Sequence, residues 1–194
     1  PPDYEQPWEA SIAGRAQALG VATNELAYDL MLEGERGSNL YLAMANYAEG
    51  NLDAVGDILR HPDVLPGLGD GGAHAATICD GSYSTFALSH WGRDRQHGRM
   101  PIPELVHRLS RATATMMGLH DRGLIAPGFK ADVNVIDFDR LALHSPEISH
   151  DLPGGGIRLL QKATGYVATI NSGVPVYREG EPTGELPGRL VRGR

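Results

Sequence analysis

The chain has 194 residues, of which 41% are hydrophobic, with one cysteine and a formal net charge of −7. This length suffices for one good hydrophobic core and a piece of a second domain. An acidic charge without a basic run argues against a nucleic-acid partner, and a single cysteine excludes a disulfide framework. No apolar run approaches the ~20 residues that span a bilayer, so we expect no membrane partner. Because the chain has only one cysteine, we expect a reducing cytoplasm as the compartment.

The first half of the chain alternates helical and strand-like patterns. Apolar residues at helical spacing predict helices over residues 8–19, 23–33 and 51–59. The continuous apolar runs at 40–45 and 64–68 flank the third helix and predict strands that are buried on both faces. These two runs and the helix between them are typical of a β-α-β unit.

The second half changes to strand patterns. Residues 71–100 show no clear period, which predicts a long irregular loop of the kind that often carries function. A helix is predicted over 103–118, a strand over 132–138 and a β-hairpin over 166–177. Alternating helices and strands followed by strands alone indicate the end of an α/β domain with a small β appendage.

A glycine-rich turn, GLGDGGAH at 67–74, follows the second apolar run and carries one carboxylate, Asp70, and one imidazole, His74. Many α/β enzymes carry reactive residues at the carboxyl end of a strand. An aspartate there can bind a metal and take a proton from metal-bound water. The alternative, which spacing alone slightly favours, is that Asp70 caps the turn and His74 is a solvated loop histidine.

The same glycines also match the G-x-G-x-x-G dinucleotide fingerprint. That fingerprint needs a helix that opens at its third glycine, Gly72, and holds the pyrophosphate at its N-terminus. Residues 73–84 show no helical stripe, so the acid–base or metal interpretation fits better than a dinucleotide site.

A dense polar cluster, HWGRDRQH, occupies residues 90–97. Either Arg93 or Arg95 could bind an anionic substrate group bidentately. We favour the structural alternative, in which Arg93 pairs with Asp94 and Trp91 packs against the fold.

Three stretches together resemble the C-terminal part of an amidohydrolase-superfamily enzyme. They are GDGGAH at 69–74, HWGRD at 90–94 and GLHDRGLIAPGFKAD at 118–132, of which the last is the most specific. The most similar subgroup is the D-aminoacylase (N-acyl-D-amino-acid deacylase) branch, also called amidohydrolase 3. The resemblance covers about residues 40–194 and is weaker over the first forty.

The resemblance implies an α/β fold that consists of the last β/α units of a (β/α)₈ TIM-type barrel followed by C-terminal strands of a small β-sandwich. Residues 1–120 would be the C-terminal portion of the barrel, and residues 121–194 the C-terminal segment of a composite sandwich.

The resemblance also implies an enzyme with a metal centre, usually zinc, that hydrolyses non-peptide C–N bonds in a small-molecule amide. Asp70 matches the aspartate that contacts the metal and shuttles the proton, and His74 would line the substrate site. The branch carries an arginine in this loop for the substrate carboxylate, but residues 75–86 contain none. That role falls to Arg93 or Arg95, or the substrate is not an N-acyl-D-amino acid.

The histidine ligands of the family have no counterpart in this chain, which also begins without a methionine. We therefore expect part of a longer enzyme that holds no zinc centre alone. We expect the remaining N-terminal part, or a homo-oligomer, to cover its exposed faces. The alternative is a non-catalytic fragment or assembly module of the same fold.

Overall fold

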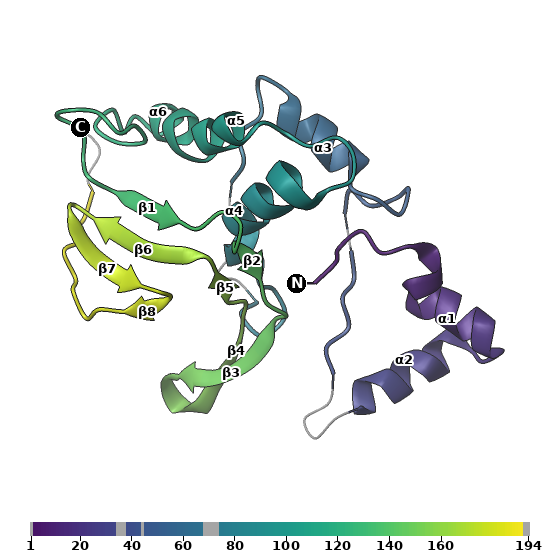
Figure 1. Ribbon diagram of the computed structural model, residues 1–194. Coiled ribbons are helices and arrows are strands. Elements are labelled where there is room, and N and C mark those ends of the chain that lie inside the picture. The colour runs from purple at the N-terminus through teal and green to yellow at the C-terminus, as the bar shows by residue number, and fades with distance from the viewer. Residues whose placement is uncertain (1, 34–37, 44, 68–73, 192–194) are drawn as a thin grey trace. The chain divides into compact units, whose positions relative to one another are not determined.

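The structure is a computed structural model that describes residues 2–33, 38–43, 45–67 and 74–191. The chain divides into two compact units, Asp3–His61 and Pro62–Arg194, with Pro1–Pro2 assigned to the second. Both helices and antiparallel sheets are present, so the chain is a mixed α/β protein (Figure 1). No helix in the described part of the chain has the length and apolar character that crossing a membrane requires.

The smaller unit is helical. Its elements are the 3-10 turn η1 (Trp8–Ala10) and the helices α1 (Ile12–Leu19), α2 (Thr23–Leu32) and α3 (Asp53–Arg60). The side chain of Ser11 accepts a hydrogen bond from the Gly14 N–H and caps α1, and Gly20 ends this helix in the left-handed conformation. Ala16, Leu26 and Leu30 form the buried core between α1 and α2. The three helices predicted in this region are confirmed.

The strands predicted on either side of α3 are not found. Residues 40–43, 45 and 64–67 adopt no regular structure, and residues 44 and 68 lie outside the described part. A strand needs a neighbouring backbone to satisfy its N–H and C=O groups, which an apolar run alone does not provide. Tyr41 and Leu42 are instead 65% and 78% exposed.

The larger unit contains a helix that the sequence did not predict. The helix α4 (Tyr83–Phe86) continues directly into the π-helix η3 (Ala87–Asp94), after a 3-10 turn η2 (Asp80–Ser82). The expectation of an irregular loop over residues 71–100 is therefore wrong for this stretch. The buried face of the helix includes Trp91, which is 1% exposed.

A second helix was predicted correctly. The segments α5 (Ile102–His107), η4 (Arg108–Ala112) and α6 (Thr113–Met116) follow one another without a break, with a π-helical turn in the middle. Gly118 follows this helix in the left-handed conformation, at φ 71°. Gly92 lets it approach η3, because a Cβ at position 92 would overlap the Ile102 side chain.

The rest of the larger unit is antiparallel sheet. The main sheet has the order β1-β6-β7-β8, and its register pairs Val133 with Ile170. Two smaller ladders join β2 to β5 and β3 to β4. The bounds are β1 (Val133–Ile136), β2 (Ala142–Leu143), β3 (Glu147–Leu152), β4 (Gly156–Leu160), β5 (Ala163–Thr164), β6 (Tyr166–Asn171), β7 (Val174–Arg178) and β8 (Glu181–Pro182), with η5 (Pro153–Gly155) as the β3–β4 turn. The predicted strand and hairpin correspond to β1, β6 and β7.

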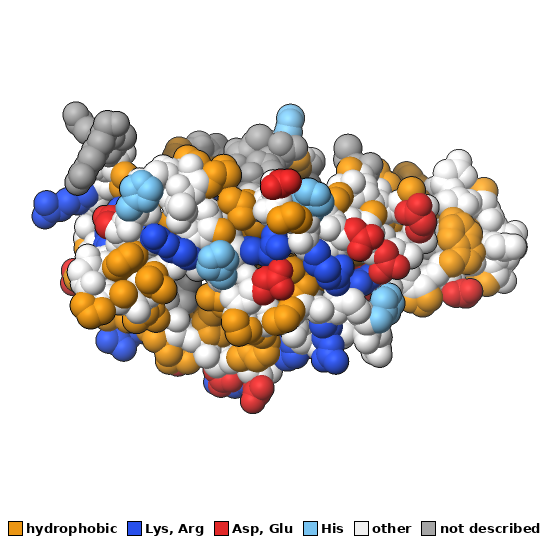
Figure 2. Space-filling model, turned by 90° about the horizontal axis from the view of Figure 1, so that it is seen from above, with side chains coloured by type: hydrophobic (Ala, Val, Ile, Leu, Met, Phe, Trp, Pro, Cys, Tyr) orange, Lys and Arg blue, Asp and Glu red, His pale blue; other side chains and the backbone are white. Residues whose placement is uncertain are grey.

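Large hydrophobic side chains are exposed in both units. Met116 and Ile125 of the larger unit are 70% and 86% exposed. On the face in Figure 2, hydrophobic side chains lie scattered among charged ones of both signs. This surface differs from a charge-segregated one, in which basic side chains gather in one patch.

Candidate functional site

The proposed catalytic residue Asp70 and its neighbouring glycines lie outside the described residues, so its role stays a prediction. His74 is described and exposed. Its φ is 47°, a left-handed conformation that is uncommon for a non-glycine residue. The His74 carbonyl accepts hydrogen bonds from the N–H groups of Thr77 and Ile78, at 2.8 and 3.0 Å. These bonds close a turn that leaves the imidazole toward solvent.

The loop that follows His74 is attached to strand β4 and to the residue after it. The N–H of Leu159 donates to the Ala75 carbonyl at 2.7 Å. The hydroxyl of Ser82 donates to Oε1 of Gln161. The loop is therefore fixed near both ends by residues about 80 positions later in the chain.

Arg93 is held by the fold rather than left free for a ligand. Nε and Nη2 donate to the two carboxylate oxygens of Asp94, at 2.6 and 2.9 Å. Nη1 donates to the carbonyls of Phe138 and Asp139, and Nη2 also donates to that of Leu141 at 2.7 Å. A guanidinium has five N–H donors, and these contacts account for all of them.

The predicted Arg93–Asp94 pair is confirmed. The hydrogen bond from Arg93, with its positive charge, holds the pKa of Asp94 below its usual value, although burial opposes this. Because Arg93 has no donor left in this arrangement, the structure gives no support to its alternative role in binding a substrate carboxylate.

Arg95 is also part of the interior. It is 5% exposed, and its guanidinium carbon lies 4.5 Å from the centre of the Trp91 ring. Its Nη1 donates to the His97 carbonyl at 3.2 Å. Arg93 thus lies on η3 and Arg95 directly after it, and both contact protein groups. His74 lies on a separate loop.

A metal centre does not emerge from the described residues. In the ranges given above, His, Cys, Asp and Glu side chains nowhere form a group of three that could hold an ion. Zinc sites in proteins use three or four protein ligands. The described residues therefore do not fit a zinc centre, and we assign no reaction step to a metal.

The most specific motif, GLHDRGLIAPGFKAD, forms a junction between a helix and the main sheet, which sequence reasoning missed. Arg111 on η4 donates to the carbonyls of His120 and Arg122, at 3.3 and 3.1 Å. Its guanidinium carbon lies 5.4 Å from the centre of the Phe129 ring. Gly123 packs against the same turn of the helix. Arg111 and Gly123 thereby attach the motif to the helix.

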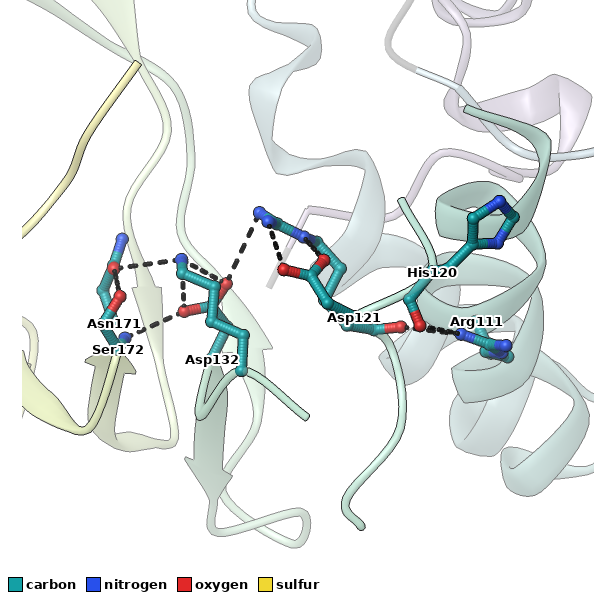
Figure 3. A network of polar contacts seen from close by, with 8 residues as sticks. Arg111, His120, Asp121, Asp132, Asn171 and Ser172 are labelled. Carbon is teal, nitrogen blue, oxygen red and sulfur yellow. Dashed lines mark hydrogen bonds and ion pairs between the residues drawn. The ribbon is translucent and has the colours of Figure 1, made fainter. Parts of the chain in front are cut away.

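The other side of the junction is an ion-pair network (Figure 3). Nζ of Lys130 bonds both carboxylate oxygens of Asp132, at 2.8 and 2.7 Å, and reaches Oδ1 of Asn171 at 3.3 Å. The Ser172 N–H donates to Oδ1 of Asp132 at 2.9 Å, and Nη1 of Arg122 lies 4.0 Å from Oδ2 of the same carboxylate. Burial raises the pKa of Asp132, but the bonds from Lys130 and Ser172 and the two cationic charges outweigh burial and lower it.

A shallow groove of about 620 Å³ lies beside this network. It is lined by Asp121, Arg122, Lys130, Ser172, Pro187, Arg189, Leu190 and Val191. Asp121 pairs with Arg122, whose hydrogen bond lowers the pKa of the carboxyl. The carboxylates here are ionised and paired, an arrangement that stabilises a junction and does not suit a general base.

The comparison with known families identifies the chain. The profile of the amidohydrolase family matches residues 13–177. This chain belongs to the amidohydrolase family. A D-aminoacylase from Alcaligenes xylosoxydans xylosoxydans is 26% identical over 166 residues, which are 84% of this chain and 31% of that protein. The chain thus spans about a third of the length of this relative. No solved structure gives a significant match.

The match confirms the resemblance inferred from the three motifs, including its weaker part upstream of residue 40, since it begins at residue 13. It spans the glycine-rich turn, η3 and the junction motif. Amidohydrolases generally use metal ions, and the ligands for one are not found among the described residues of this chain.

Proposed function

We propose that this chain is the C-terminal portion of a metal-dependent amidohydrolase that cleaves non-peptide C–N bonds in small-molecule amides. N-acyl-D-amino acids are the first substrate class to test, because the curated relative is a D-aminoacylase. The observation that carries the proposal is the family match over residues 13–177, which includes the GDGGAH motif. The expected zinc would be bound chiefly by residues outside this chain, and this chain would contribute Asp70.

In this proposal Asp70 is the proton shuttle. It takes a proton from the attacking water and returns it to the leaving nitrogen, as a positioned carboxylate can. His74 contacts the substrate, since it is exposed at the start of the loop that follows Asp70. Arg93 and Arg95 support the fold, so the group that binds a substrate carboxylate is sought elsewhere.

We further propose that residues 1–120 belong to a (β/α)₈ barrel and residues 121–194 to a composite β-sandwich. The supporting observation is that the described residues after 121 form strands and short turns without a helix beyond η5. The remaining N-terminal part of the enzyme, or a second copy, would cover exposed side chains such as Leu42 and Ile125. The cytoplasm is the proposed location, because Cys79 has no second cysteine in the chain.

The substitution Asp70→Asn in the complete protein tests the proposal. We expect turnover to fall by about 10²–10⁴-fold, because general acid–base catalysis contributes an effect of this size. Metal content should stay largely unchanged. Asp57→Asn is the matched control, because the Asp57 side chain is 88% exposed on α3. Retained turnover in Asp70→Asn would contradict the role of Asp70, and a wild-type protein inactive on all amides tested would favour a non-catalytic module.

A further inference from the structure

The loop from His74 to Ser82 is held by two contacts that the proposed chemistry does not use. At one end the Leu159 N–H of β4 donates to the carbonyl of Ala75, the residue directly after His74. At the other end Ser82 donates its hydroxyl hydrogen to Gln161. Both partners come from one stretch of three residues, so a single β-segment sets the path of the loop.

Gln161 is fixed on both sides of its amide. Its Nε2 donates to the His144 carbonyl at 2.9 Å, while its Oε1 accepts from Ser82. The backbone beside it is held too, since the His144 N–H donates to the Lys162 carbonyl at 2.9 Å. The bond to His144 keeps the amide nitrogen turned away from Ser82, so the oxygen is presented to the hydroxyl.

The next turn of the chain is also attached to a strand. The hydroxyl groups of Thr85 and Tyr166 lie 2.7 Å apart, and Thr85 is 5% exposed. The residues that follow Ser82 therefore enter the interior of the fold, whereas His74 is exposed. The Ser82–Gln161 bond is thus a side-chain contact between the loop and the segment after β4.

We infer that Ser82 and Gln161 are positioning residues that hold His74 where it meets the substrate. The inference rests on the proposed role of His74 as a substrate contact. A loop already in its bound conformation loses less conformational freedom when the substrate binds. Removal of the Ser82–Gln161 bond allows the loop to leave this conformation, which weakens substrate binding more than it slows the chemical step.

The test uses the complete protein and compares Gln161→Met with Lys162→Met. Lys162 is the neighbouring residue, with a side chain that is 71% exposed and pairs with exposed Glu147. We expect Gln161→Met to raise KM about fivefold, the effect of one lost hydrogen bond, with kcat within about twofold of wild type. Lys162→Met should leave both constants unchanged.

A second set of variants separates positioning from a loss of folding. Ser82→Ala should raise KM as Gln161→Met does, the double variant should be no worse than either, and Ser82→Thr, which keeps a hydroxyl, should restore KM. Hydrogen exchange of the Thr77 and Ile78 amides, which bond to His74, should speed up in Gln161→Met. If Gln161→Met does not fold, the comparison of Ser82→Ala with Ser82→Thr tests the inference without it.

The outcomes distinguish this inference from the function it rests on. His74→Ala should raise KM by itself; if it does not, the proposed substrate contact is wrong. If His74→Ala raises KM while Gln161→Met and Ser82→Ala leave both KM and amide exchange at wild-type values, the positioning role is overturned. Fully additive effects in the double variant would also contradict it.

Discussion

Gly123 lies directly against the backbone of Arg111. A Cβ at position 123 would sit 2.8 Å from the Arg111 Cα and 2.9 Å from its nitrogen, closer than real Cβ contacts. Gly123 also has φ 79°, so both its conformation and its surroundings require glycine. This contact joins the family's motif to the helix and explains why the motif contains a glycine after its Asp-Arg pair.

We predict that Gly123→Ala lowers the free energy of unfolding by about 2–4 kcal/mol, the sum of backbone strain and an overpacked contact. Gly128→Ala is the matched control. Gly128 has φ 85°, but nothing lies within 4 Å of a Cβ there, so only the strain of about 1 kcal/mol remains. Thermal unfolding of the two variants measures the difference. Equal shifts in Tm would show that the contact with Arg111 is not tight.

The lowered pKa of Asp132 makes stability depend on pH. The folded pKa lies below the unfolded value of about 3.9, so the contribution is fully present above that value. It is lost as pH falls through the folded pKa. We predict that Tm of the wild type falls more steeply between about pH 5 and about pH 2 than Tm of Asp132→Asn. The exposed control Asp57→Asn should follow the wild type; parallel curves for Asp132→Asn and wild type would contradict the prediction.

Arg93→Lys distinguishes a structural arginine from a substrate-binding one. Lysine cannot reproduce the planar fork that joins Asp94 to the carbonyls of Phe138 and Leu141, so we expect a loss of about 2–4 kcal/mol in stability. Tm and KM are measured on the same sample. A raised KM with an unchanged Tm would restore the interpretation that Arg93 binds the substrate carboxylate.

Elements with local signals were predictable, and those that depend on distant partners were not. The helix from Ile102 to Met116 has an apolar stripe, a proline near its start and Gly118 after its end. The helix from Tyr83 to Asp94 buries Thr85 and Ser89, which do not register as core residues in a hydrophobic pattern. Its polar groups find partners within the fold: Ser89 bonds the Thr85 carbonyl, and Thr85 reaches Tyr166.

The candidate site shows the same division. The Arg93–Asp94 pair is readable because the two residues are adjacent, but the carbonyl acceptors of Arg93 lie 45 or more positions later. The bond from Lys130 to Asn171 likewise spans 41 positions. Spacing cannot reveal such contacts, since they depend on which strands become neighbours. The strand expected at 40–45 failed for the complementary reason: its apolar character is local, but its hydrogen-bonding partner is not.

The contacts of Arg93 also have a consequence for synthesis. After Arg93 leaves the ribosome, another 48 residues must emerge before the last carbonyl that it will bind, that of Leu141, leaves too. At about 5–20 residues per second, this interval is about 2–10 s. During that time the guanidinium has only Asp94 and water as partners, and the helix that carries it cannot reach its final packing. This segment of the nascent chain therefore stays without its final packing until the strands that follow it have emerged.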